Sequence, residues 1–333
     1  MTPRIGIIPG DPSGIGPELI ARLLEDECTA QAHILLIGDA HVFERGQEQA
    51  GIAHDLRAVE VADTVWTEQP SFALHPTETI SPDEVKIAES TEASGRSTLR
   101  VLDEALELAK ANIIDGIVFG PFNKTSMHLA GIGHSDELHY MAEKLGVQGY
   151  VSELNTLDGM WTSRVTSHIA LKDVAAAING DRIKDATHLI DRVLRRAGYT
   201  RPRIAVAALN PHAGDGGNFG REEIDVIEPA VRDLALMQMA VEGPTPSDTV
   251  FRKVTGGELD AVVTMYHDQG QIALKLLGFD RGVTVQGGLP IPVTTPAHGT
   301  AFDIAGQGRA DLGATRKAFE IACDMVKNWG RIG

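Results

Sequence analysis

Three histidines lie at or near the ends of hydrophobic segments that are typical of β-strands. They are His168 within segment 165–171, His212 after segment 204–209, and His267 after segment 261–265. In open α/β sheets ligands collect at the carboxyl ends of the strands, so imidazoles delivered there from distant segments can converge on one cation. The three histidines are therefore predicted to bind a divalent metal ion, with zinc, magnesium, manganese and cobalt as candidates.

Polar residues that follow His267 could assist such a metal. Asp268 comes directly after it. An aspartate beside a metal-bound histidine commonly orients the ring, although Asp268 could also bind the metal itself. Further along, Lys275 lies in the otherwise apolar run 272–277. A buried ammonium group is costly without an anion, which favours a substrate-binding role, and a solvated lysine on an amphipathic helix is the alternative.

Two glycine-rich loops follow predicted strands. The loop 210–220 is denser in glycine and polar residues than a connection requires, which is typical of a functional loop at a strand end. The loop 10–18 follows the first strand, and its Pro17 and Glu18 suit the first turn of a helix. Its spacing matches neither the dinucleotide fingerprint nor the P-loop. A tight turn and a ligand-contacting loop are both open, and Asp11 is the residue to test.

A third loop, at residues 295–306, carries His298 and Asp303. We expect a helix to begin near Gly299 or Thr300. Its first backbone N–H groups, the imidazole and the carboxylate could then contact a ribose or an adenine.

Short β-rich runs alternate with amphipathic stretches along the chain. Strands are expected at 5–8, 33–37, 113–119, 165–171, 204–209 and 261–265, and helices around 18–24, 99–109 and 183–194. This alternation predicts βαβ units, a mainly parallel sheet and a globular α/β fold. With 333 residues the chain exceeds the roughly 250 to 300 residues of a single core, so two lobes with a cleft are expected. The first lobe is expected to span 1–131 plus 298–333, and the second 132–297.

Composition excludes several classes of partner. The chain has 46 acidic and 30 basic side chains and a net charge of -16, which disfavours nucleic acid because a phosphate backbone requires a basic face. No segment reaches the ~18 apolar residues of a membrane span, and the amino terminus lacks the regions of a signal peptide, so a cytoplasmic protein is expected. Cys28 and Cys323 have no metal-binding or redox spacing and are expected to be ordinary core or surface residues.

Four motifs of this chain occur together in one known protein family. They are the loop at Gly10, Asn-Pro-His-Ala-Gly from Asn210, Tyr-His-Asp-Gln-Gly from Tyr266, and His-Gly-Thr-Ala-Phe-Asp-Ile-Ala-Gly from His298. Over essentially the whole chain they resemble the 4-hydroxythreonine-4-phosphate dehydrogenase family of vitamin B6 synthesis. The first and last motifs also look like parts of isocitrate and isopropylmalate dehydrogenases. The resemblance implies a two-lobed α/β/α fold with mainly parallel sheets, and a homodimer with active sites shared across its interface.

The resemblance also implies the cofactors. In that family three histidines that match the predicted metal ligands hold the divalent cation, and NAD or NADP is bound by a non-Rossmann loop. The residues of this loop that are implied to bind the cofactor are His298, Gly299, Thr300 and Asp303.

Substrate contacts carry over from the family in part. The Gly-His-Thr-Glu segment of the family matches the residues around His134 and Ser135, which are implied to bind substrate, and Lys275 is retained. The family's later substrate-binding asparagine and arginine fall on Thr284 and Val293. A valine cannot replace the bidentate anion recognition of an arginine fork.

The expected activity is oxidation of a hydroxyl β to a carboxylate, with hydride transfer to NAD(P)+ and loss of CO2 from the β-keto acid. Asp248 matches an aspartate near the family's metal, and Asp248 and Lys275 are the candidates for proton transfer. One alternative is a paralogue acting on another hydroxy acid, such as 4-phosphoerythronate, 4-phosphothreonate or a cis-dihydrodiol carboxylate. A hydrolase whose three histidines activate water, and a noncatalytic ligand sensor, are alternatives from other classes.

Overall fold

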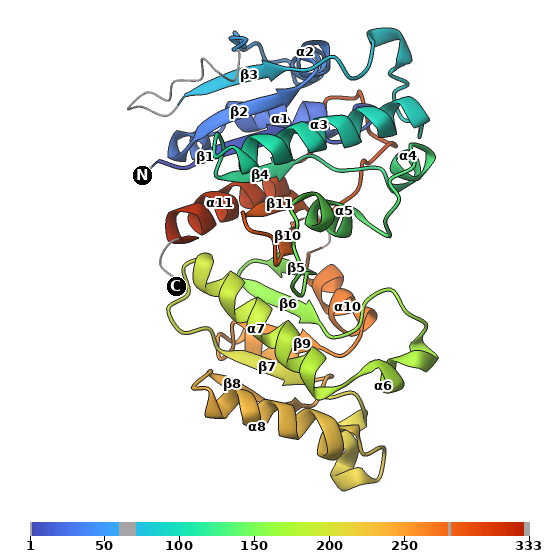
Figure 1. The fold of residues 1–333 in the computed structure, drawn as a ribbon, viewed down its shortest axis with the longest axis vertical. Helices are drawn as coiled ribbons and strands as arrows, with labels where there is room; N and C mark the ends of the chain where they lie inside the picture. The colour runs from blue at the N-terminus through green and yellow to red at the C-terminus, as the bar shows by residue number, and fades with distance from the viewer. Residues whose placement is uncertain (1, 60–70, 279–280, 330–333) are drawn as a thin grey trace. The chain divides into compact units, whose positions relative to one another are not determined.

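The computed structural model describes residues 2–59, 71–278 and 281–329, and it divides the chain into two compact units. The first unit contains Met1–Gln148 and Val283–Trp329, and the second contains Gly149–Gly282. Strands flanked by helices make up each unit (Figure 1). None of the helices in the described part of the chain combines the length and apolarity that a membrane crossing needs.

In the first unit the strands follow the order β3-β2-β1-β4-β11-β10, and all run parallel except β10. They are β1 (Arg4–Ile8), β2 (His33–Gly38), β3 (Phe72–Pro76), β4 (Gly116–Phe119), β10 (Val283–Gly287) and β11 (Val293–Pro296). The helices are α1 (Gly16–Leu24), α2 (Ala40–Ala50), α3 (Glu92–Lys110), α4 (Lys124–Leu129), α5 (Glu137–Lys144) and α11 (Gly313–Asn328), with 3-10 turns at Glu27–Gln31 and Pro82–Glu84.

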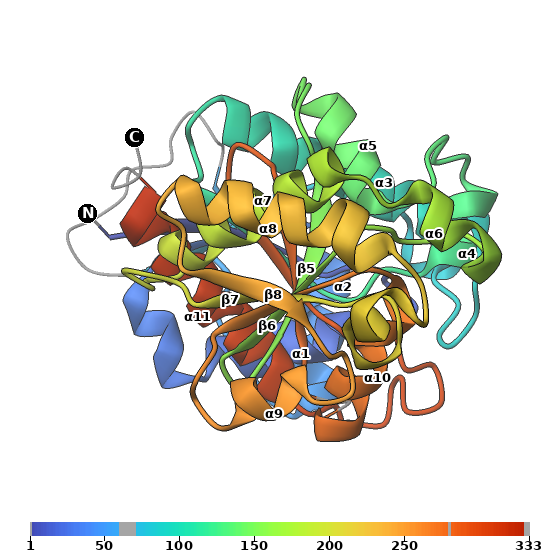
Figure 2. The same cartoon turned by 90° about the horizontal axis from the view of Figure 1, so that it is seen from below.

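The order of these strands explains how the helices cover them. The chain passes from β1 through α1 to β2 in one direction, and then from β3 through α3 to β4 in the other. Because such crossovers are right-handed, α1 and α3 lie on opposite faces of the strands, as Figures 1 and 2 show. Strands covered on both faces must be apolar throughout, and every residue of β2 and β4 is buried.

In the second unit the strands follow the order β5-β6-β9-β7-β8, with β5 and β6 antiparallel and the others parallel. They are β5 (Ser152–Leu157), β6 (Met160–Arg164), β7 (Ile204–Ala207), β8 (Val241–Thr245) and β9 (Ala261–Thr264). The helices are α6 (Val174–Ala177), α7 (Gly180–Arg196), α8 (Glu228–Leu236), α9 (Val250–Thr255) and α10 (His267–Gly278), with short turns at Leu171–Asp173 and Pro211–Gly217 and a π-helical turn at Glu223–Ile227. Figure 2 shows α7 and α8 on one face and α9 and α10 on the other.

Helix α7 shows how local sequence forms these elements. The side chain of Asn179 accepts a hydrogen bond from the backbone N–H of Arg182 and so caps the first turn. Its apolar residues recur at helical spacing and are buried, among them Ile183, Ile190 and Leu194. The predicted helix is confirmed, as is the α/β class with mainly parallel strands.

The observed division of the chain falls at 148–149 and 282–283, whereas lobe boundaries were expected at 131–132 and 297–298. Helix α5 belongs with the first unit because Tyr140 and Lys144 both bond to Asp103 of α3, at 2.8 and 2.9 Å. Strands β10 and β11 belong there because β11 pairs with β4.

The expected strand at 165–171 is wrong. Strand β6 ends at Arg164, and only Val165 and Thr166 extend its pairing, by donating to the carbonyl oxygens of Thr264 and Met265. The neighbouring strand β9 ends at Thr264, so the chain has no further partner and turns. The result places His168 beyond the strand rather than inside it.

Candidate metal and cofactor sites

His168 and His267 lie next to each other in the second unit. Their ring centroids are 5.6 Å apart, with an angle of 42° between the ring planes. His267 begins α10 directly after β9, and His168 lies just beyond the paired strand β6. Two imidazoles that share one zinc ion, each nitrogen about 2.1 Å from it, have centroids roughly 5 Å apart. The spacing of this pair therefore fits two ligands of one cation.

Asp268 engages the ring of His267. Its Oδ1 lies 2.7 Å from Nδ1 of His267. A carboxylate on one ring nitrogen fixes the tautomer and leaves the other nitrogen, Nε2, to donate its lone pair to a metal. The contact is the one that an orienting aspartate would make, and both this role and direct metal binding by Asp268 stay predictions.

His212 does not join this pair. Within the described residues, no three His, Cys, Asp or Glu side chains come close enough together to hold a metal ion. The ring of His212 instead lies near Phe219, with centroids 6.3 Å apart. Residues 212–216 all have positive φ, so the loop coils on itself instead of extending from β7. One chain by itself therefore brings two of the three predicted ligands together, and the set of three stays a prediction.

The side chain of Gln269 forms hydrogen bonds to three separate segments of the site. The sequence patterns do not reveal this role of Gln269. Its Nε2 donates to the carbonyl oxygen of Ala208 at 2.7 Å and to Oγ of Ser247 at 2.8 Å. Its Oε1 accepts from the backbone N–H of Met265 at 2.6 Å. Ala208 precedes His212 in the chain, Ser247 precedes Asp248, and Met265 precedes His267. Gln269 therefore contacts all three segments that carry these predicted site residues. The only sequence signal was its place in the Tyr-His-Asp-Gln-Gly motif.

Lys275 and Asp248 are both exposed. Of the two interpretations of Lys275, the ammonium group is on the solvated side of its helix, because Leu274 is the residue of that helical turn that faces the core. Its role in substrate binding stays a prediction. Asp248 follows Ser247, whose hydroxyl donates to the carbonyl oxygen of Ala208 at 2.6 Å. Exposure leaves both side chains accessible to a substrate.

The loop after β11 carries the residues expected to bind the cofactor. Nδ1 of His298 lies 3.0 Å from the carbonyl oxygen of Gly299, Thr300 is buried, and Asp303 is exposed. The expected helix start at this point is wrong. The chain forms successive turns until α11 begins, and Ala301 has a positive φ of 44°, which a right-handed helix cannot accommodate.

Helix α1 holds this loop in place. Oε1 of the buried Glu18 accepts from the backbone N–H of Ala310 at 2.9 Å. The same carboxylate pairs with Arg22 at 2.9 Å, and Arg22 donates to the carbonyl oxygen of Gly308 at 2.7 Å. One ion pair on α1 therefore bonds to the backbone of this loop at two positions, Gly308 and Ala310.

The glycines of the loop before α1 allow close backbone packing. A side chain at Gly10 would place its Cβ 2.4 Å from the carbonyl oxygen of Gly120, and one at Gly14 would place it 2.8 Å from Cβ of Thr300. The backbone N–H of Ile15 donates to the carbonyl oxygen of Thr300 at 3.1 Å. These contacts favour a tight supporting turn over a phosphate cradle.

Asp11 is fully buried within this turn. Its Oδ1 accepts from the backbone N–H of Ser13 at 2.8 Å. Burial raises the pKa of the Asp11 carboxyl above its usual value of 3.8, although the hydrogen bond from Ser13 opposes the rise. Asp11 is thus a pH-sensitive group inside the supporting turn.

His134 and Ser135 precede α5 in the first unit. Nε2 of His134 lies 3.1 Å from Oε2 of Glu143, and its ring packs edge-on against Tyr140 with centroids 5.8 Å apart. Ser135 is exposed, and its hydroxyl donates to Asp136 at 3.1 Å. The imidazole of His134 is therefore held by two side chains of the helix that follows it, α5.

Thr284 and Val293, the positions that depart from the family, are both buried on the antiparallel pair β10 and β11. Neither side chain carries a charge. Val293 has no exposed surface, so its side chain cannot contact a bound substrate anion.

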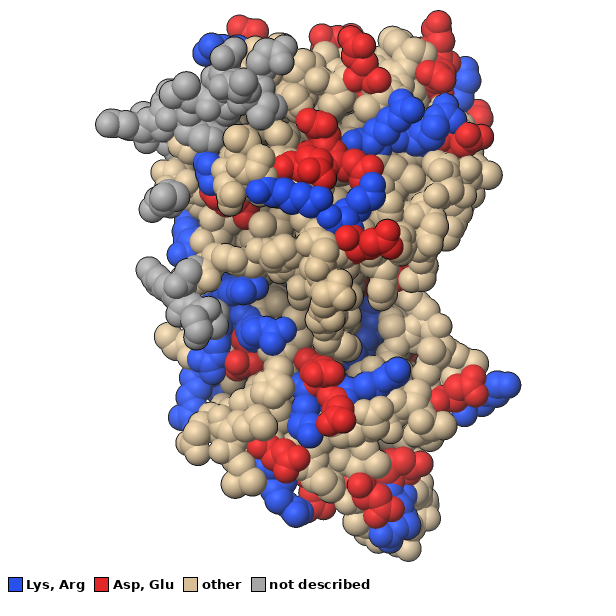
Figure 3. All heavy atoms as spheres, in the orientation of Figure 1, with Lys and Arg blue, Asp and Glu red and all other residues tan. Residues whose placement is uncertain are grey.

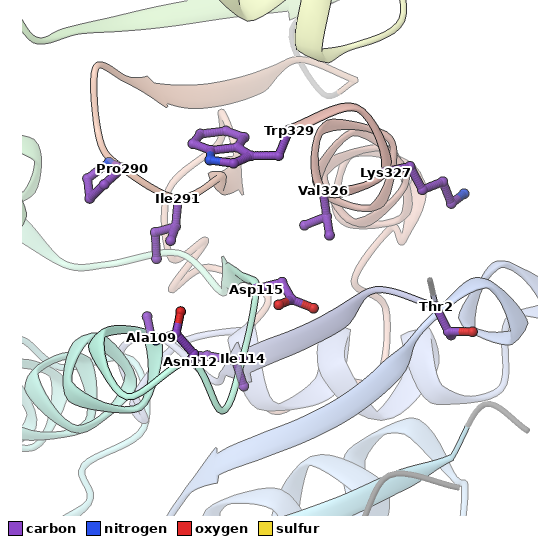
Figure 4. Close-up of a pocket in the computed structure, with 10 residues that line it drawn as sticks. All are labelled: Thr2, Ala109, Asn112, Ile114, Asp115, Pro290, Ile291, Val326, Lys327 and Trp329. Atoms are coloured by element: carbon purple, nitrogen blue, oxygen red, sulfur yellow. The ribbon is translucent and has the colours of Figure 1, made fainter. Parts of the chain in front are cut away.

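Two cavities in the first unit lie away from the predicted site residues. One of about 300 Å³ lies at the amino ends of the strands and is lined by residues that include Asp115, Ile291 and Trp329 (Figure 4). The other, of about 590 Å³, lies beside the carboxyl ends of β2 and β3 and is lined by Asp39 and His41 among others. On the face that Figure 3 presents, Lys and Arg lie beside Asp and Glu in scattered clusters, and uncharged residues cover most of the surface.

Comparisons with known proteins agree on one family. The family model described as pyridoxal phosphate biosynthetic protein PdxA matches residues 30–322. A Pseudomonas aeruginosa protein provisionally named 4-hydroxythreonine-4-phosphate dehydrogenase 2 is 56% identical over 329 residues, which cover 98% of each chain. The D-threonate 4-phosphate dehydrogenase of Salmonella typhimurium is 37% identical, over 98% of this chain and 99% of that one.

Solved structures give the same result. The crystal structure of 4-hydroxythreonine-4-phosphate dehydrogenase from Klebsiella pneumoniae superposes with a TM-score of 0.84 and is 34% identical, with 98% of each chain covered. A terephthalate 1,2-cis-dihydrodiol dehydrogenase from Burkholderia xenovorans gives a TM-score of 0.66 at 28% identity, covering 93% of this chain and 94% of that one. The similarity thus extends over the whole chain in both sequence and fold. The protein belongs to the PdxA family and is an oxidoreductase of the dehydrogenase type.

Proposed function

We propose that this protein is a divalent-metal-dependent, NAD- or NADP-linked dehydrogenase that oxidises the hydroxyl β to the carboxylate of a small phosphorylated hydroxy acid, and that the β-keto acid then loses CO2. The name of the Pseudomonas relative suggests 4-hydroxythreonine 4-phosphate as the substrate. The observation that carries the proposal is the ring pair of His168 and His267, 5.6 Å apart at neighbouring strand ends, with Asp268 on His267. Membership of a dehydrogenase family disfavours the hydrolase alternative.

The second unit would hold the metal. His168 and His267, completed by His212, form a donor set of three imidazoles that suits a divalent cation. Bound there, the cation supplies Lewis-acid polarisation of the substrate oxygens. Asp268 holds the His267 ring in one tautomer, so that its free nitrogen is available as a ligand.

The first unit would bind the nucleotide through the loop after β11. NAD(P)+ supplies the hydride acceptor when bound. The loop contributes His298, Gly299, Thr300 and Asp303, and α1 keeps it rigid through the Glu18–Arg22 pair.

Other side chains would transfer protons and bind the substrate. The Asp248 carboxylate and the Lys275 amine are the two candidates to accept the hydroxyl proton. If Asp248 is the acceptor, Lys275 in its charged form pairs with a substrate anion. His134 and Ser135 donate hydrogen bonds to polar groups of the substrate.

We further propose a homodimer in which His212 of the second copy completes the set of His168 and His267. Exposed apolar side chains flank these residues: Ile169 and Leu171 beside His168, Phe219 beside His212, and Ile272 and Leu276 on either side of Lys275. Apolar side chains gathered around polar residues mark an interaction surface. The partner proposed for this surface is a second copy, as the resemblance implies.

The metal requirement can be tested directly. Substitution His212→Ala should abolish metal-dependent turnover, since it removes one of three ligands. Activity that survives complete removal of divalent metal by a chelator would refute the mechanism.

Sharing of the site can be tested by complementation. His212→Ala and His267→Ala variants carry different affinity tags, are co-expressed, and the doubly tagged dimer is isolated. If His212 comes from the partner, one site of this dimer is intact and the other lacks both rings, so about half of the wild-type activity is expected. If the three ligands come from one chain, both sites are damaged and the dimer is inactive.

A second candidate is a dehydrogenase of the same mechanism that acts on another hydroxy acid. The buried Val293 favours it, because the family's anion-binding arginine is absent there. Relatives are named for D-threonate 4-phosphate and for a terephthalate cis-dihydrodiol. A panel of 4-hydroxythreonine 4-phosphate, 4-phosphothreonate, 4-phosphoerythronate and a cis-dihydrodiol carboxylate, followed by NADH absorbance, distinguishes the two candidates by kcat/KM.

A further inference from the structure

We propose that Glu223 is the positioning residue of the His212 loop, here residues 209–217, and that it thereby sets the affinity of this protein for its divalent cation. The inference rests on the proposed function, because it takes His212 as a metal ligand. Nothing in the sequence pattern singles out Glu223, which lies eleven residues after His212 at the start of the π-helical turn.

Glu223 is 2% exposed, and its carboxylate lies against the backbone of the loop. Its Oε1 accepts from the backbone N–H groups of Leu209 and Asn210, at 2.8 and 2.7 Å. Its Oε2 accepts from Nδ2 of Asn210 at 2.9 Å. Three donors from the segment that leads to His212 therefore converge on one carboxylate, and bonds to a charged acceptor are the strong ones.

The conformation of the loop explains why such an anchor is needed. His212, Ala213 and Asp215 have φ of 53°, 53° and 44°, in the left-handed region. Each non-glycine residue there costs about 1 kcal/mol or more, so the turn persists only where its surroundings determine it. Gly214 closes the turn over the carboxylate, since a Cβ at that position would lie 2.7 Å from Oε2 of Glu223.

An amide cannot replace this carboxylate. In a Glu223→Gln variant one oxygen becomes an NH2 group, which is a donor and faces donors of the same kind. At least one of the three bonds is lost and the loop gains alternative conformations. When a loop that carries a metal ligand becomes ordered only on binding, the free energy of ordering it lowers the affinity for the metal.

Metal binding measures the effect. Affinity for Co2+ or Zn2+, determined by competition with a chromophoric chelator, should fall in Glu223→Gln. Removal of a partner bonded directly to a ligand lowers affinity about 10- to 100-fold, and that range is the upper limit here because Glu223 acts through Leu209 and Asn210. The absorption bands of the Co2+ protein should also change, since they report ligand geometry and are insensitive to stability. The matched control is Glu228→Gln on α8, whose carboxylate pairs with the exposed Arg232 at 3.0 Å, and it should bind metal as the wild type does.

Hydrogen exchange of the metal-free protein gives a readout that needs no metal. The amides of Leu209 and Asn210 should lose protection in Glu223→Gln and keep it in Glu228→Gln. Should Glu223→Gln fail to fold, Asn210→Ala removes the bonds that Nδ2 donates to Glu223 and Glu222 and keeps both backbone bonds to Glu223, and it is expected to show several-fold weaker metal binding.

The outcomes separate this inference from the proposed function. If His212→Ala lowers metal affinity but Glu223→Gln and Asn210→Ala leave it and the amide protection unchanged, the positioning role is overturned and the metal site stands. If His212→Ala binds metal as tightly as the wild type, His212 is no ligand and both proposals fail.

Discussion

Burial changes the acid–base behaviour of single side chains in the first unit. Asp11, Cys28 and Cys323 are all buried, and in each case burial disfavours the charged form and raises the pKa. For Cys323 the pKa rises to about 12. These groups therefore titrate or react differently from exposed residues of the same type.

Asp11 should make stability depend on pH. Its pKa in the folded state lies above the usual 3.8, so its favourable contribution is fully present below about pH 4 and is lost as the pH rises through the raised pKa. The Asp11→Asn variant keeps an acceptor for Ser13 but does not titrate. Between pH 4 and neutrality the free energy of unfolding of the wild type should therefore fall relative to that of the variant. Urea unfolding across this range measures the difference, and parallel curves would contradict it.

The two cysteines should be inert in the native protein. Deprotonation of Cys28 and Cys323 is opposed mainly by burial, and the thiolate is the reactive species. Labelling with a disulfide reagent at pH 8 should be at least tenfold slower in the native protein than in urea, where both thiols react. Rapid labelling of the native protein would show that one of them is exposed.

At the scale of elements, α1 supports the loop that follows β11. The fully buried Glu18 and its partner Arg22 hold the backbone of Gly308 and Ala310. The loop itself has no regular structure before α11, so its conformation depends on such contacts with its neighbours.

Removal of the Glu18 carboxylate should weaken binding of the cofactor more than it slows the chemical step. Glu18→Ala leaves the N–H of Ala310 without its acceptor and Arg22 without its carboxylate partner, and an unsatisfied buried donor costs about 1 to 3 kcal/mol. We expect KM for NAD(P)+ to rise several-fold while kcat changes little. The control is Glu92→Ala, which breaks the exposed pair with Arg96 and should change stability by less than ~0.5 kcal/mol. An unchanged KM in Glu18→Ala would show that the loop holds its shape without α1.

At the scale of the whole molecule, the second unit exposes most of the large apolar side chains that the described residues leave in contact with solvent. Several of them flank predicted site residues, whereas Leu236 at the end of α8 lies on an element without any. The proposed dimer interface and the proposed active site therefore lie on the same segments of the second unit.

A charge in the proposed interface should dissociate the dimer. Leu276 is 82% exposed on α10, so Leu276→Glu is compatible with the fold of one chain but would bury a carboxylate between two copies. Analytical ultracentrifugation should show a monomer, and activity should be lost because the proposed site takes His212 from the second copy. Leu236→Glu, at a position that is 76% exposed, should stay dimeric and active. If Leu276→Glu and Leu236→Glu are both dimeric and active, the interface does not include Leu276.

Much of the fold was predictable because strand and helix patterns are local. The buried strands at Ile204–Ala207 and Ala261–Thr264 and the amphipathic helix α7 appear close to where apolar periodicity places them. The strand ending at Arg164 was misplaced because its length is set by its partner β9 and not by its own residues.

The site was predictable only in its parts. The sequence by itself determined which residues can do chemistry: three histidines near strand ends, Asp268 beside one of them, and a polar loop after β11. Tertiary structure alone decided that His168 and His267 are neighbours while His212 lies in a separate left-handed turn, and that Glu223 and Gln269 hold these segments. The physical reason is that residue type and periodicity report burial along one element, whereas a hydrogen bond from Gln269 to Ala208 exists only after strands distant in sequence have paired.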